Sequence, residues 1–122
     1  MKVKQFIESY QKAFDAFDAE AIADLYHYPS LIASMDQSQA MVSRDDAVKY
    51  FARVCDSHRR MGYHRALLLN SERSTLTENL AMVTVRWRFE TSTAQVIVEF
   101  DCTYTLCDLG QGVKAFSAVV HG

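Results

Sequence analysis

Histidine and cysteine are two residue types in this chain that can carry acid–base or nucleophilic chemistry. A histidine titrates near neutral pH and can move a proton, and a cysteine thiolate is a nucleophile. The chain has four histidines and three cysteines, namely His27, His58, His64, His121, Cys55, Cys102 and Cys107.

None of these residues stands in a spacing typical of a metal site or a disulfide. His58 and His64 can in principle share a metal ion, but no further ligand lies nearby at zinc-site spacing. Cys102 and Cys107 differ by five positions on one predicted strand, so they face opposite sides and cannot bridge. We therefore expect no metal, no cofactor and no disulfide, and free thiols favour a reducing, cytoplasmic compartment.

A long hairpin positions Cys102 and dominates the pattern of the chain. Two strands are predicted, from Leu80 to Glu90 and from Gln95 to Cys107, because apolar and polar residues alternate in both. The apolar face is Ala81, Val83, Val85, Trp87, Phe89, Val96, Val98, Phe100, Cys102, Tyr104 and Leu106. A four-residue loop pairs Glu90 with Gln95, which predicts Trp87 opposite Val98 and Arg86 opposite Glu99. Cys102 faces inward without a basic partner, as a small buried hydrophobe does.

Helices precede the hairpin in the sequence. An apolar stripe at three- and four-residue spacing, from Val3 to Phe17, predicts a first helix. Asp18 is a predicted N-cap for a second helix from Ala19 to His27, ended by Pro29. Ser43 and Asp46 resemble a capping box for a third helix, Arg44 to about Met61, which places His58 in its solvated last turns.

Four further strands complete the order of elements. Short strands are predicted at Ser30–Met35 and Ala40–Val42, and long ones at Tyr63–Leu76 and Val113–His121. Helices and strands in this order predict an α+β fold, in which a curved antiparallel sheet packs on three helices.

Composition limits the classes of partner. The 122 residues make a single domain, residues 1–122, and the net charge of −2 does not favour nucleic acid. The longest apolar run is far below a membrane span, and Met1 leads directly into the first helix without an apolar signal region. We therefore expect a cytoplasmic protein that binds neither nucleic acid nor membrane.

Two stretches carry a resemblance to a known family. Tyr10 to Tyr26 reads YQKAFDAFDAEAIADLY, and Ser43 to Val48 followed by Phe51 is similar to that family's third-helix start. The whole chain resembles the nuclear-transport-factor-2-like superfamily, which includes SnoaL-like polyketide cyclases, ketosteroid isomerase and scytalone dehydratase. The resemblance implies a cystatin-like, cone-shaped half barrel with an apolar cavity at its wide end, and a homodimer formed through the sheet.

The same resemblance, combined with strand alternation, implies which residues line the cavity. The ligand would be a small apolar or aromatic molecule. Its expected contacts, beside Tyr10, are Phe6, Phe14, Tyr26, Trp87, Phe89, Phe100, Cys102 and Tyr104.

The resemblance also implies candidate catalytic residues. Tyr10 falls where ketosteroid isomerase carries its oxyanion-hole tyrosine, although a core tyrosine bonded to backbone explains it too. The isomerase's base falls on Ser34, which cannot replace it, and Asp36 lies two residues on. Its neutral aspartate falls on Thr103 or Cys102, so isomerase chemistry is disfavoured. Dehydratases and cyclases of the family use histidine or aspartate, and His27 is the best-placed histidine.

Three hypotheses stay open, and they differ in whether the protein is an enzyme. In the first, a SnoaL-like domain binds its ligand and acts as a lyase, isomerase or cyclase, with Tyr10 donating a hydrogen bond and His27 or Asp36 moving the proton. In the second, side chains fill the interior of a non-catalytic binding or dimerisation module. The third is a protein-docking domain, which needs an exposed apolar patch on the sheet that the sequence does not indicate.

Overall fold

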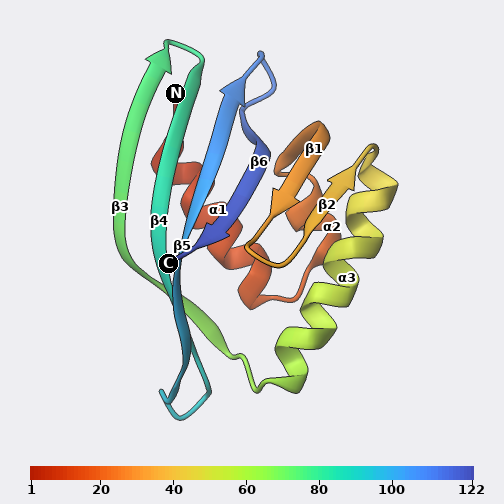
Figure 1. Cartoon of the computed structure of the whole chain (residues 1–122), viewed down its shortest axis with the longest axis vertical. Coiled ribbons are helices and arrows are strands. Elements are labelled where there is room, and N and C mark those ends of the chain that lie inside the picture. Colours follow the sequence, from red (N-terminus) through yellow and green to blue (C-terminus); the bar gives the residue numbers. More distant parts are fainter.

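Six strands form one curved sheet, and three helices cover its inner side (Figure 1). The structure is a computed structural model that describes all residues from Met1 to Gly122. The helices are α1 (Val3–Asp15), α2 (Ala19–Ala23) and α3 (Arg44–Arg60). The strands are β1 (Tyr26–Ala33), β2 (Ser38–Met41), β3 (Arg65–Thr77), β4 (Leu80–Glu90), β5 (Val96–Asp108) and β6 (Val113–His121).

The strand order is β2-β1-β6-β5-β4-β3, so the sheet is open at both edges. The predicted α+β fold, a curved sheet packed on three helices, is confirmed. Four of the five strand pairings are antiparallel, whereas β1 runs parallel to β6. In Figure 1, α1 passes behind β5 and β6 and α3 runs beside β2. None of the helices is long and apolar enough to cross a bilayer.

The helix caps follow the predicted sequence signals. The Asp18 carboxylate accepts a hydrogen bond from the Ala21 N–H at 3.0 Å, and this begins α2. The Ser43 hydroxyl accepts from the Asp46 N–H at 3.3 Å, which begins α3 as predicted. These bonds satisfy N–H groups that have no partner inside the helix.

The second helix is shorter than predicted, and the prediction that it extends to His27 was wrong. It ends at Ala23, and β1 begins at Tyr26. The Leu25 carbonyl accepts the Ala115 N–H of β6 at 2.8 Å, so the sheet takes up the backbone that the helix would have used. Tyr26 is buried and His27 is exposed, which is the alternation of a strand.

The predicted residue pairs of the β4–β5 hairpin are displaced by two. Trp87 lies opposite Phe100 instead of Val98, and Arg86 lies opposite Asp101 instead of Glu99. Glu90 pairs with Val96 across a five-residue turn, which accounts for one residue of the displacement, and a register shift between Phe89 and Glu90 accounts for the other. Because a displacement of two keeps each side chain on its face, most of the predicted inward face is buried, namely Ala81, Val83, Val85, Trp87, Cys102, Tyr104 and Leu106. Val96 and Val98, which lie next to the turn, were predicted inward but are exposed.

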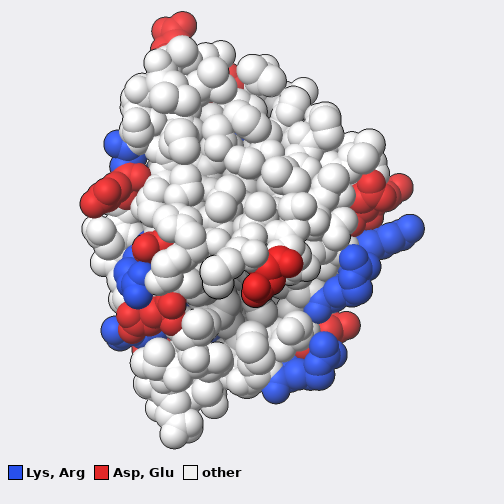
Figure 2. Space-filling view, viewed as in Figure 1, with Lys and Arg blue, Asp and Glu red and all other residues white.

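The outer face of the hairpin carries ion pairs. The Arg86 guanidinium lies 3.2 Å from the Asp101 carboxylate, and that of Arg88 lies 2.7 Å from Glu99. In Figure 2, charged side chains gather on the left beside β3 and β4 and on the right over α3, and the surface between them is mostly uncharged.

Candidate functional site

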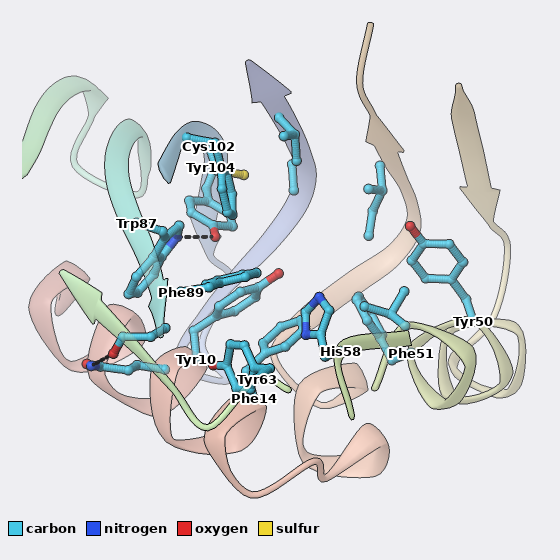
Figure 3. A pocket seen from close by; sticks show the side chains of 17 residues that line it. Tyr10, Phe14, Tyr50, Phe51, His58, Tyr63, Trp87, Phe89, Cys102 and Tyr104 are labelled. Atoms are coloured by element: carbon cyan, nitrogen blue, oxygen red, sulfur yellow. Dashed lines mark hydrogen bonds between the residues drawn. The ribbon is translucent and has the colours of Figure 1, made fainter. Parts of the chain in front are cut away.

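A cavity of about 160 Å³ lies between the inner face of the sheet and the helices (Figure 3). Fifteen of its 17 lining residues are hydrophobic, and the other two are Gln11 and His58. No aspartate, glutamate, lysine or arginine reaches it. The hydrophobic lining consists of Tyr10, Phe14, Ile32, Tyr50, Phe51, Val54, Tyr63, Ala66, Trp87, Phe89, Phe100, Cys102, Tyr104, Ala118 and Val120.

Most of the residues that we predicted as ligand contacts lie on this cavity. Tyr10 lines it, together with Phe14, Trp87, Phe89, Phe100, Cys102 and Tyr104. Phe6 and Tyr26 do not, because both are packed in the core. Phe6 instead borders a second, more polar hollow beside Met1 and the β5–β6 turn.

Two hydrogen-bonded aromatic pairs contribute to the inner wall, through Tyr10, Trp87 and Tyr104. The Tyr10 and Tyr26 hydroxyls are 2.9 Å apart, and the Trp87 indole N–H donates to the Tyr104 hydroxyl at 3.0 Å. Burial raises the pKa of Tyr10, Tyr26 and Tyr104 well above its usual value. These phenols therefore stay neutral at pH 7 and do not act as bases.

Cys102 lies in the same wall and is unreactive there. Burial raises the pKa of its thiol to about 12. Because the thiolate is the nucleophile, a thiol with so high a pKa is inert at neutral pH. This agrees with its interpretation as a small buried hydrophobe.

His58 lines the cavity, and its predicted place in the solvated end of α3 was wrong. Its ring stacks on Tyr63 with 5.0 Å between ring centroids, and lies 5.7 Å from Phe14 and 5.1 Å from Phe89. Its Nδ1 atom is buried and has no hydrogen-bond partner. Burial lowers the pKa of this imidazole below its usual value, so the ring is neutral at pH 7. His58 follows Phe51 by seven residues and Val54 by four, and that helical spacing is the sequence signal that identifies it.

Two side chains of α1 fix the wall next to His58. The Asp15 carboxylate accepts the Tyr63 hydroxyl at 2.6 Å and the Ala66 N–H at 3.0 Å. The Gln11 amide donates to the Ala66 carbonyl at 2.6 Å. These bonds join α1 to the first residues of β3, and they hold the Tyr63 ring on which His58 stacks.

The other two catalytic candidates lie away from the cavity. His27 is exposed on β1, and Asp36 is exposed in the β1–β2 turn, where its N–H donates to the Ser34 hydroxyl at 3.3 Å. Neither residue lines the cavity or bonds to Tyr10. The structure therefore does not bring the three predicted catalytic residues together. Nor does any group of three or more histidine, cysteine, aspartate or glutamate side chains have the arrangement of a metal site.

Comparisons with known proteins identify the fold and the family. Residues 1–122 match a family model described as NTF2-like protein (DUF6841). No curated protein sequence matches the chain. Among solved structures, an NTF2-like protein with a cystatin-like fold from Novosphingobium aromaticivorans aligns with a TM-score of 0.79 at 14% identity, over 98% of this chain and 78% of that one.

Two more solved structures show the same fold. An NTF-2 like protein of unknown function from Shewanella oneidensis MR-1 has a TM-score of 0.77 at 13% identity, over 97% of this chain and 94% of that one. A protein from Streptomyces avermitilis, provisionally named a dehydratase of the NTF2-like family, aligns with a TM-score of 0.74 at 14% identity, over 98% of this chain and 91% of that one. The match of the family model along the whole length shows that the chain belongs to the NTF2-like family.

Proposed function

We propose that this protein binds one small apolar or aromatic molecule in the cavity between its sheet and its helices. The observation that carries the proposal is the cavity itself, whose lining is hydrophobic at 15 of 17 positions. Apolar walls hold water poorly, so an apolar guest that displaces the water is favoured.

The volume limits the size of that molecule. Ligand pockets commonly measure about 300–1,000 Å³, whereas this one measures about 160 Å³. An apolar protein cavity of about 150 Å³ is large enough to hold benzene. The space therefore fits one aromatic ring with small substituents, and is too small for a molecule of several fused rings.

Catalysis in this cavity is a further step of the same proposal. Tyr10 lines the cavity, and its hydroxyl, supported by Tyr26, is a neutral donor for an oxygen that gains negative charge. That role suits the lyase, isomerase or cyclase chemistry expected of a SnoaL-like domain. The provisionally named dehydratase from Streptomyces avermitilis has the same fold and is consistent with it. His27 and Asp36 do not line the cavity, so binding is supported more strongly than proton transfer.

The experiment is a titration that uses the single tryptophan as reporter. Trp87 is the only tryptophan and lines the cavity, so its indole N–H resonance should shift when toluene binds. Ala118→Leu places extra carbon atoms in the cavity and should abolish saturation, whereas Ala52→Leu at an exposed site of α3 should not. Absence of saturable binding to the native protein would refute the proposal and favour the non-catalytic module. Equal binding by the Ala118→Leu variant would place the site elsewhere.

A further inference from the structure

We propose that His58 is the polar anchor of the cavity, and that it donates a hydrogen bond to an oxygen of a neutral, one-ring aromatic ligand. The inference rests on the proposed function and adds to it the chemical class of the ligand and the residue that recognises it.

Most other polar groups of the lining already have partners within the protein, with the exception of the Tyr50 hydroxyl. Tyr10 is bonded to Tyr26, Trp87 to Tyr104 and Tyr63 to Asp15. Among the lining residues, the one whose polar atom is buried without a partner is His58, at Nδ1. The His58 imidazole makes no hydrogen bond within the protein at either ring nitrogen, and Nε2, unlike Nδ1, is not buried, so Nε2 is the atom available to a ligand. Figure 3 shows the His58 ring among the aromatic side chains that surround the cavity.

The form of the imidazole decides which group it can bind. A neutral imidazole carries one N–H and one lone pair. A buried N–H without a partner is rarer in proteins than a buried acceptor without one, so the lone pair is expected at Nδ1. The proton is then on Nε2, which is not sealed off as Nδ1 is. His58 accordingly offers a donor, and the ligand offers an acceptor such as a carbonyl or ether oxygen.

The walls determine the charge and shape of the ligand. Because no charged side chain lines the cavity, an ionised ligand would lose its hydration without gaining a counter-ion. The rings of Phe89 and Phe100 meet edge to face, at 87° and 5.0 Å between centroids. Such an arrangement presents ring faces and edges that pair well with a further aromatic ring.

The test compares two molecules of the same shape, acetophenone and α-methylstyrene, in which a C=O replaces a C=CH₂. Each is titrated into the native protein and into His58→Phe, and the Trp87 indole N–H resonance is followed. We expect the preference for acetophenone over α-methylstyrene to fall by about 2- to 12-fold in His58→Phe, since a neutral hydrogen bond contributes about that much. His58→Gln retains a donor and should keep part of the preference. Benzoate, an ion of similar size, should not saturate.

The outcomes separate this inference from the proposed function. If both neutral molecules bind but His58→Phe leaves their ratio unchanged, the anchor role of His58 is wrong while the cavity remains the binding site. If benzoate binds as tightly as acetophenone, the ligand class is wrong. If neither neutral molecule binds the native protein, the proposed function fails and the inference fails with it. Thermal unfolding of each variant shows whether it is folded.

Discussion

Replacing His58 by phenylalanine should make the protein more stable. The native imidazole keeps its Nδ1 atom buried without a hydrogen-bond partner. A buried polar group left without a partner costs about 1–3 kcal/mol, and phenylalanine has no such atom. It also preserves an aromatic ring against Tyr63, Phe14 and Phe89.

The size of the gain follows from three contributions. Removing the unpartnered nitrogen contributes about 1–3 kcal/mol. Histidine and phenylalanine have similar helix propensities, so α3 itself changes little. Phenylalanine is larger than histidine, but the neighbouring cavity of about 160 Å³ gives it space, which limits the cost of overpacking. We therefore expect a net stabilisation of about 1–2 kcal/mol.

Urea denaturation at several pH values is the assay, because the two proteins should differ in pH dependence as well. The ordinary pKa of histidine, 6.5, applies to His58 in the unfolded chain, and burial lowers this pKa in the folded protein. Below pH 6.5 the unfolded chain therefore binds more protons than the folded protein. The native protein should therefore lose stability as the pH falls through the window between 6.5 and that lowered pKa. The groups that face the His58 imidazole are the neutral rings of Phe14, Tyr63 and Phe89, and the Asp15 carboxylate is bonded to the Tyr63 hydroxyl. The variant should lack this component.

An exposed histidine provides the control. His27→Phe on β1 should change the free energy of unfolding by less than about 0.5 kcal/mol and should keep the component from His58. The reasoning is refuted if His58→Phe destabilises the protein by 1 kcal/mol or more. It is also refuted if the native protein and His58→Phe lose stability in parallel as the pH falls.

Four other outcomes are expected. Trp87→Ala should destabilise the protein by about 3–5 kcal/mol in denaturant titrations, because the indole is buried and bonded; a loss under about 1 kcal/mol would contradict this packing. Tyr10→Phe should cost about 1–2 kcal/mol in the same assay by leaving the Tyr26 hydroxyl without its partner, and no loss would show that the bond is not formed. Asp15→Ala should cost about 2–4 kcal/mol and Asp15→Asn less, since asparagine keeps an acceptor oxygen; equal losses would mean that the carboxylate's charge is what matters. A homodimer formed through the sheet would bury the ion pairs of Arg86, so its gel-filtration volume should differ between low and high ionic strength.

The part of the fold that the sequence predicts best is the part with a strict period. In β4 and β5 the alternation assigns each side chain to a face without knowledge of the exact pairing. That is why Trp87 and Cys102 were placed inward correctly although the pairs themselves were displaced by two. The pairing depends on the length of the turn and on the shift between Phe89 and Glu90, and a bulge of this kind leaves no periodic trace in the sequence.

Local signals fail where a distant strand decides the structure. The residues after Asp18 have the cap and the apolar spacing of a helix. Nothing in the sequence indicates that this helix ends at Ala23 and that a strand begins at Tyr26. The backbone of β6, about ninety residues later, takes the Leu25 carbonyl as a hydrogen-bond acceptor and draws the following residues into the sheet. Tertiary pairing of this kind overrides helix propensity, which is a weak preference. The wrong prediction for His27 is a direct consequence. It was expected at the end of a helix but lies on a strand, where its side chain is exposed.

His58 shows how a site residue can be hidden by its type rather than by its position. Its spacing from Phe51 and Val54 is that of the buried stripe, but a polar residue in a last helical turn is usually explained by solvent and by the helix dipole. The structure instead puts this polar ring among Phe14, Tyr63 and Phe89, where it has the cost of burial without the compensation of a partner. Sequences that fold well violate local rules mainly where function requires it. A polar residue that continues an apolar stripe is therefore a better starting point for locating a ligand than an exposed histidine such as His27.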